Sequence, residues 1–123
     1  MAKKRILVVD DEVELVKAMS IRLQQAGYEV LSAFDGQEGL EKAKKEKPDL
    51  VILDLMLPKM DGYKVCGLLK ADARYNSIPV IMATARAQES DEKLGFEVGA
   101  DAYLVKPFQY EKFLAKIKEL LKE

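Results

Sequence analysis

The chain has 123 residues, 49% of them hydrophobic and 33% charged, with a formal net charge of −1. These values are typical of one globular domain with a substantial core, and the near-neutral charge argues against a general attraction to nucleic acids or anionic membranes. Because no apolar run approaches the roughly 20 residues of a membrane span and the single cysteine, Cys66, excludes an internal disulfide, we expect a cytoplasmic protein.

Five short apolar runs alternate with amphipathic stretches along the chain. Their richness in Val, Ile and Leu predicts strands; the runs are ILVV (6–9), YEVLSAF (28–34), LVIL (50–53), PVIMA (79–83) and AYLV (102–105). Four of them are expected to be buried on both faces, whereas the alternating pattern of 28–34 favours an edge strand.

The stretches between the runs have helical spacing. The first ends before Gly27, a typical residue just after a helix, and its apolar positions are Val16, Met19, Leu23 and Ala26. The third and fifth repeat this spacing at Val65, Leu68 and Leu69 and at Phe113, Leu114, Ile117, Leu120 and Leu121. The second (35–48) and fourth (89–99) are weaker, because each contains an interior glycine. The alternation predicts one α/β domain, residues 1–123, with a doubly wound five-stranded parallel sheet.

The residues that follow the strands are polar and could form a site. Asp10 and Asp11 follow the first run, and Asp54, Thr84 and Lys106 follow the third, fourth and fifth. Because parallel strands end at one edge of a sheet, where ligands bind, these side chains are expected to converge. The Asp-Gly pair after the second run is interpreted as a plain turn.

Three carboxylates at one point repel one another: two unit charges about 4 Å apart repel by roughly 4 kcal/mol at an effective dielectric constant of 20. We therefore expect a cation among them, and an all-oxygen site with few protein ligands suits Mg²⁺, with Mn²⁺ as a substitute. With Asp54 as nucleophile, such a site fits phosphoryl transfer to a carboxylate, and Lys106 and Thr84 would bind the transferred group. The chain has no histidine, which excludes a Ser–His or Cys–His pair within it.

Each residue also has an ordinary interpretation when taken alone. The acids 10–12 could cap a helix, Asp61 could cap the third helix, Thr84 could end a strand, and Lys106 could be an exposed residue before a proline. Cys66 falls on the apolar side of the third helix and is interpreted as packing. The joint interpretation is favoured, because four of the five strands end in a residue of one mechanism.

Four motifs carry a resemblance to a known family; they are VVDDE (8–12), LDLMLPKMDG (53–62), ATA (83–85) and YLVKPF (103–108). In this order and spacing they resemble the receiver domain of bacterial two-component response regulators, of the stand-alone chemotaxis type, over essentially the whole chain. The resemblance implies a flavodoxin-like (βα)5 fold with strand order 2-1-3-4-5. It also implies a phosphorylation-activated signalling switch, and not an enzyme beyond catalysis of its own phosphorylation and slow dephosphorylation.

The resemblance assigns a role to each motif residue. Asp54 is the phosphorylated residue, and the Mg²⁺ ligands are Asp10, Asp11, Asp54 and the backbone carbonyl of Met56. Thr84 and Lys106 sense the phosphoryl group, and the ring of Tyr103 moves inward in response. Structural roles fall to Gly62, to the small Ala85 and to Pro107, whose peptide bond is expected to be cis.

The resemblance also implies the partners. The phosphoryl group would come from a phosphohistidine on a histidine kinase or a histidine phosphotransfer protein, which accounts for the missing histidine. Signalling is expected through helix 4, strand 5 and helix 5, roughly residues 88–121. We expect a monomer or a phosphorylation-dependent dimer, no output domain, no direct contact with nucleic acid or membrane, and an effector that the sequence does not identify. A phosphorelay intermediate is the alternative.

Two enzyme or binding classes fit less well. A Mg²⁺-dependent aspartyl-phosphate phosphatase usually has an acid two residues after its nucleophile, where this chain has Met56. A flavin-binding module would need a Gly/Ser/Thr-rich phosphate loop where this chain has Asp10 and Asp11.

Neither Met56 nor Arg86, two residues after Thr84, can act as a base for a hydrolytic water, so we expect self-dephosphorylation on the order of minutes or longer.

Overall fold

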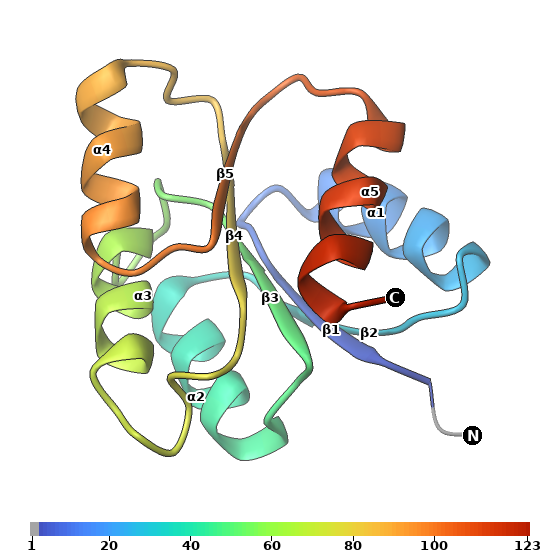
Figure 1. Ribbon diagram of the computed structural model, residues 1–123, viewed down its shortest axis with the longest axis horizontal. Helices are drawn as coiled ribbons and strands as arrows, with labels where there is room; N and C mark the ends of the chain where they lie inside the picture. Colours follow the sequence, from blue (N-terminus) through green and yellow to red (C-terminus); the bar gives the residue numbers. More distant parts are fainter. Residues whose placement is uncertain (1–2) are drawn as a thin grey trace.

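A computed structural model describes residues 3–123, which alternate between strands and helices (Figure 1). The strands are β1 (Arg5–Val9), β2 (Glu29–Ala33), β3 (Leu50–Leu53), β4 (Val80–Thr84) and β5 (Ala102–Val105). The helices are α1 (Val13–Gln25), α2 (Gly36–Glu46), α3 (Gly62–Lys70), α4 (Glu89–Glu97) and α5 (Tyr110–Leu121). Each apolar run and each amphipathic stretch therefore corresponds to one element, with small differences at the ends.

The strands of this described part form one parallel sheet in the order β2-β1-β3-β4-β5, which confirms the predicted fold class and strand order. β1 has a neighbour on each side, because Ile6 lies opposite Val30 of β2 and opposite Leu50 of β3. Since the strands are parallel, the residues that follow them gather at one edge of the sheet.

Helices cover both faces of the sheet, α1 and α5 on one and α2, α3 and α4 on the other (Figure 1). Successive strand residues point to opposite faces. In β1, Leu7 and Val9 belong to the core under α2 and α3, whereas Ile6 and Val8 belong to the core under α1 and α5. This double coverage is why the central strands are continuous apolar runs and not alternating ones.

The two edge strands differ in how well the sequence predicted them. β2 lies at an edge, as its alternating pattern predicted. β5 lies at the other edge and three of its four residues are only partly buried, so the prediction that 102–105 is buried on both faces was wrong. Leu68, predicted on the apolar side of α3, is 41% exposed, and this prediction was also wrong. A short apolar run cannot by itself distinguish these environments.

The start of α2 packs closely and is capped. A Cβ on Gly39 would lie 2.7 Å from Cγ1 of Val9 in β1, so space requires a glycine there. Asp35 caps the helix, because its carboxylate accepts a hydrogen bond from the N–H of Glu38 at 2.7 Å. The interpretation of residues 35–36 as a plain turn was therefore wrong. The interior glycine that made this helix look weak is instead what lets it approach the sheet.

Other predicted boundaries agree with the structure. Gly27, just after α1, has a φ of 101°, a conformation that favours glycine. Asp61 caps α3, accepting a hydrogen bond from the N–H of Lys64 at 3.0 Å. Cys66 is fully buried, as predicted for a packing residue. Within residues 3–123, no helix combines the length and apolar character needed to cross a membrane.

Candidate functional site

The residues after the strands are held at the edge of the sheet by backbone hydrogen bonds. The N–H groups of Asp10 and Asp54 each donate to a carbonyl of a neighbouring strand at 3.1 Å. The N–H of Lys106 donates to the carbonyl of Thr84 at 2.8 Å. These bonds extend the sheet by one residue, so the polar side chains start from fixed positions at its rim.

Three carboxylates meet at this rim. Asp10, Asp11 and Asp54 each offer an oxygen, and these oxygens lie within 4.8 Å of one another. Asp10 and Asp54 are 4% and 8% exposed, whereas Asp11 is open to solvent. The structure thus brings together the acids that the sequence predicted to converge. Such a set of oxygen donors fits a small, hard divalent cation.

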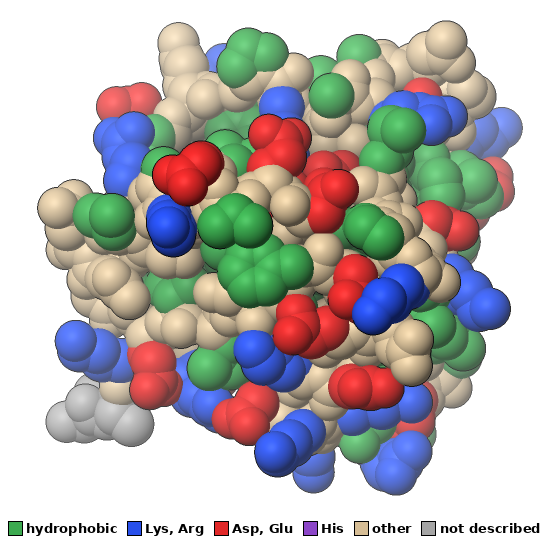
Figure 2. All heavy atoms as spheres, turned by 180° about the vertical axis from the view of Figure 1, so that it is seen from behind, with side chains coloured by type: hydrophobic (Ala, Val, Ile, Leu, Met, Phe, Trp, Pro, Cys, Tyr) green, Lys and Arg blue, Asp and Glu red, His purple; other side chains and the backbone are tan. Residues whose placement is uncertain are grey.

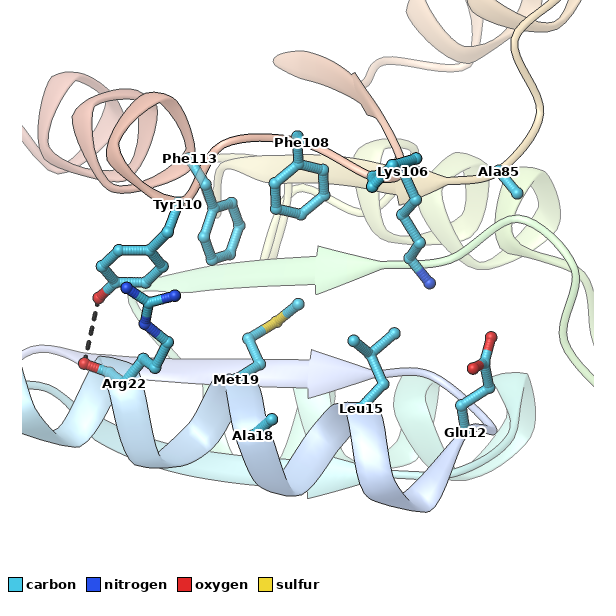
Figure 3. A pocket seen from close by; sticks show the side chains of 11 residues that line it. Glu12, Leu15, Ala18, Met19, Arg22, Ala85, Lys106, Phe108, Tyr110 and Phe113 are labelled. Carbon is cyan, nitrogen blue, oxygen red and sulfur yellow. Dashed lines mark hydrogen bonds between the residues drawn. The ribbon is translucent and has the colours of Figure 1, made fainter.

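Lys106 is the counter-ion of the cluster. Its Nζ lies 2.6 Å from Oδ2 of Asp10 and 3.2 Å from Oδ2 of Asp54. Figure 3 shows the side chain extending from the segment after β5 toward the N-terminal end of α1, where Glu12 lies. Burial lowers the pKa of Lys106, but the two carboxylates outweigh it and the pKa is raised overall, so the side chain is an ammonium.

The charges of the cluster do not balance. Burial raises the pKa of Asp10, while its hydrogen bond with Lys106 acts in the opposite direction. With all three acids ionised, three carboxylates and one ammonium give a formal charge of −2. Since unbalanced charge in a partly buried site is costly, the cluster favours a positively charged ligand.

Local hydrogen bonds orient the two buried carboxylates. Oδ1 of Asp10 accepts from the N–H of Glu12 at 3.0 Å, and Oδ1 of Asp54 accepts from the N–H of Met56 at 3.3 Å. Glu12 occupies the cap position of α1, but its side chain makes no capping hydrogen bond. Glu12 therefore does not cap α1 through its side chain, and this part of the alternative interpretation of the acids 10–12 is wrong.

Thr84 and Tyr103 hold the start of the loop between β4 and α4. Oγ1 of Thr84, which is 1% exposed, accepts from the N–H of Arg86 at 3.3 Å. The hydroxyl of Tyr103 donates to the carbonyl of Arg86 at 2.7 Å. Burial raises the pKa of Tyr103 to about 12, which keeps the hydroxyl protonated near neutral pH. Both predicted switch residues therefore contact the same residue of this loop.

A second polar cluster lies beside this loop and was missed by sequence reasoning. Asp91, buried in α4, forms an ion pair with Arg86 at 3.3 Å. Tyr63 of α3 donates to the backbone carbonyl of Asp91 at 3.1 Å. An acid in the first turn of a helix is ordinary, so nothing in the sequence pattern distinguished Asp91. The cluster ties α3 and α4 to the loop that begins after Thr84.

The remaining motif residues surround the site. A Cβ on Gly62 would lie 2.8 Å from Cα of Leu55, so only glycine fits there. The Lys106–Pro107 peptide bond is cis. Ala85 and Lys106 border a cavity of about 570 Å³ between α1 and α5 (Figure 3), whose apolar walls include Leu15, Met19 and Phe108. The charged rim of the sheet thus adjoins an apolar surface on its α1–α5 side.

Comparisons with known proteins agree on one family. The family model described as the response regulator receiver domain matches residues 6–118. Similar curated proteins include the alkaline phosphatase synthesis transcriptional regulatory protein PhoP of Bacillus subtilis, 46% identical over 97% of this chain and 49% of that protein. Another is the DNA-binding dual master transcriptional regulator RpaA of Synechocystis, 48% identical over 96% of this chain and 49% of that protein. The chain spans about half the length of these curated relatives.

Solved structures give the same result. The chemotaxis protein CheY4 of Vibrio cholerae has a TM-score of 0.89 and 35% identity, covering 97% of this chain and 99% of that one. A CheY-like response regulator receiver domain protein from Methanospirillum hungatei has a TM-score of 0.90 and 36% identity, covering 98% of this chain and 95% of that one. With the strand order and the family match, these likenesses show that the chain belongs to the receiver domains of two-component response regulators.

Proposed function

We propose that this receiver domain is a signalling switch that accepts a phosphoryl group on Asp54. The observation that carries the proposal is the meeting of Asp10, Asp11 and Asp54 at one point, where Lys106 pairs with Asp10 and Asp54 and a formal excess of two negative charges remains. A cluster built only for stability would pair its buried acids fully. The excess charge instead suits a cation together with the phosphoryl group that it helps to bind.

Mg²⁺ is the cation that the donors fit best. Asp10, Asp11, Asp54 and the backbone carbonyl of Met56 would hold it, with water completing the shell. When bound, it supplies positive charge that neutralises the oxygens of the transferring phosphoryl group. Mn²⁺ is expected to substitute, because it accepts the same kinds of oxygen ligand.

Asp54 would act as the nucleophile. A bond forms between its carboxylate oxygen and phosphorus as the phosphorus–nitrogen bond of a phosphohistidine breaks, and the electron pair of that bond returns to the imidazole. Lys106, already 3.2 Å from Asp54, can turn to a phosphoryl oxygen and compensate the added charge. Because the chain has no histidine, the donor is a partner, either a histidine kinase or a histidine phosphotransfer protein.

Phosphorylation would be sensed by the loop after β4. The Thr84 hydroxyl would move toward Asp54 to donate to the phosphoryl group, and its hydrogen bond with the N–H of Arg86 would draw the loop with it. Tyr103, hydrogen-bonded to Arg86, would follow. We propose that this displacement biases the face formed by α4, β5 and α5, through which the effector is bound.

The broader role that we propose is signalling through contact with partner proteins. We propose cytoplasmic signalling by protein contact, as a monomer or a phosphorylation-dependent dimer, or transfer of the phosphoryl group along a relay. Figure 2 shows acidic and basic side chains interspersed on one face of the molecule, which gives no broad basic surface there for nucleic acid. PhoP and RpaA are named as transcriptional regulators, and this chain matches about half the length of each.

Incubation with acetyl phosphate and Mg²⁺, followed by intact-mass measurement, tests the proposal. We expect one phosphoryl group per chain, no addition with EDTA and no addition to Asp54→Asn. Asp72→Asn, which makes the same change at an acid paired with Arg74 outside the cluster, should be modified as the wild type is. Modification of Asp54→Asn would contradict the assigned residue. Rapid phosphate release without a detectable adduct would favour an aspartyl-phosphate phosphatase instead.

A further inference from the structure

The loop between β3 and α3 rests on the start of α2. The N–H of Gly36 donates to the carbonyl of Pro58 at 3.1 Å, and Nζ of Lys59 lies 3.5 Å from Oδ2 of Asp35. A Cβ on Gly36 would lie 2.6 Å from the carbonyl carbon of Met60 and would overlap the carbonyl oxygen. Space, not backbone conformation, therefore requires glycine at this contact.

Of the two segments in this contact, the loop between β3 and α3 is the one whose backbone conformation depends on its surroundings. Lys59 has a φ of 69°, and the N–H of Met60 donates to the carbonyl of Pro58 at 2.8 Å, which makes a tight three-residue turn. A residue other than glycine stays in this region only where its surroundings hold it. The first turn of α2, in contrast, is firmly capped, since Glu38 also accepts from the N–H of Phe34 at 2.6 Å.

The same loop forms one wall of the acidic site. Residues 55–58 line a cavity of about 490 Å³ together with Asp11. The loop is attached to the site at its beginning, where the N–H of Met56 donates to Asp54, and its two ends are joined where the N–H of Gly62 donates to the carbonyl of Leu55 at 2.9 Å. Between these two points the backbone of the loop contacts the start of α2, while Leu57 and Met60 pack against the hydrophobic core.

We propose that Gly36 and the Asp35–Lys59 ion pair are positioning elements for divalent-cation binding. Within residues 3–123 they form no hydrogen bond or ion pair with the three cluster carboxylates; they contact the loop that carries the backbone of Met56 beside the acid cluster. The inference rests on the proposed metal site and extends it from the rim of the sheet to α2. A change at Gly36 that displaces the loop should weaken cation binding while the carboxylates remain in place.

Calorimetric titration of the unphosphorylated protein with Mg²⁺ tests this proposal without any phosphoryl transfer. Gly36→Ala is expected to weaken Mg²⁺ binding about tenfold or more, the loss typical when a supporting contact of a metal site is removed. Gly67→Ala is the matched control, because a Cβ at Gly67 would meet nothing within 4 Å, and it should bind as the wild type does. Equal affinity of Gly36→Ala and wild type would overturn the proposal.

Two milder variants give an answer even if Gly36→Ala does not fold. Asp35→Asn and Lys59→Met break the same ion pair but change the net charge in opposite directions, and asparagine preserves the cap of α2. If the pair positions the loop, both variants weaken Mg²⁺ binding, by about two- to fivefold for a partly exposed pair. Opposite shifts, with tighter binding by Lys59→Met, would show a plain effect of local charge and overturn the proposal, as would no change in either.

The outcome for the wild type separates this inference from the function on which it rests. If the wild type binds no Mg²⁺, the proposed metal site fails and the inference fails with it. If the wild type binds Mg²⁺ and Gly36→Ala binds it equally, only the inference fails. Circular dichroism of each variant without metal shows whether the fold is retained.

Discussion

Asp11→Asn is expected to stabilise the metal-free protein and to reduce its stabilisation by Mg²⁺. The carboxylate oxygen of Asp11 lies within 4.8 Å of those of Asp10 and Asp54. Two unit charges at this separation repel by about 3.5 kcal/mol at an effective dielectric constant of 20 and by about 0.9 kcal/mol in bulk water. Because Asp11 is exposed and Lys106 offsets part of the repulsion, we expect a gain near the lower value, about 1 kcal/mol.

Urea unfolding of both proteins, in EDTA and in Mg²⁺, measures the two effects. A ligand at about 100 times its dissociation constant stabilises the folded state by about 2.7 kcal/mol, and each tenfold loss of affinity removes about 1.4 kcal/mol of that gain. Glu41→Gln, on the exposed part of α2, makes the same charge change away from the site and should alter neither quantity. Lower stability of metal-free Asp11→Asn would refute the repulsion, and an undiminished gain in Mg²⁺ would refute the role of Asp11 in binding the ion.

Three other predictions concern neighbouring residues. Lys106→Met should destabilise the metal-free protein by about 3 kcal/mol, because two buried carboxylates lose their ammonium, and unchanged urea unfolding would contradict this pairing. The phosphorylated protein should lose its phosphoryl group on the order of minutes or longer, because neither Met56 nor Arg86 is a base; a half-life of seconds in Mg²⁺ would argue against it. Burial raises the pKa of Cys66 to about 11 from 9.0, so stability should fall as the pH rises above 9, and native protein should react with a thiol reagent at pH 8 far more slowly than unfolded protein. Fast labelling of the native thiol would contradict that burial.

Much of the fold was predictable because the spacing of apolar residues along the sequence reflects which side chains are buried. Runs such as 50–53 and 79–83 are apolar throughout, since helices cover both faces of the central strands. The same signal failed for 102–105. β5 is an edge strand whose side chains are only partly covered, and the residues of the run do not indicate how far neighbouring helices will cover it.

The acid cluster was predictable because the topology brings strand ends together. Asp10 and Asp54 are 44 positions apart in the sequence, yet each directly follows a parallel strand, and this alone was enough to expect them at one edge. The contact of Gly36 with the β3–α3 loop and the pairing of Arg86 with Asp91 were not predictable. Each joins a loop to a helix, and the position of a loop against a helix depends on packing and leaves no periodic pattern in the sequence.

Titration of the unphosphorylated protein with Mg²⁺ is the most direct test of the idea that the clustered acids share a divalent ion. The excess charge of the cluster predicts saturable binding of one ion per chain, greatly weakened in Asp10→Asn and in Asp54→Asn, while Asp72→Asn binds normally. Absence of saturable binding to the wild type, or unchanged affinity in both cluster variants, would contradict it.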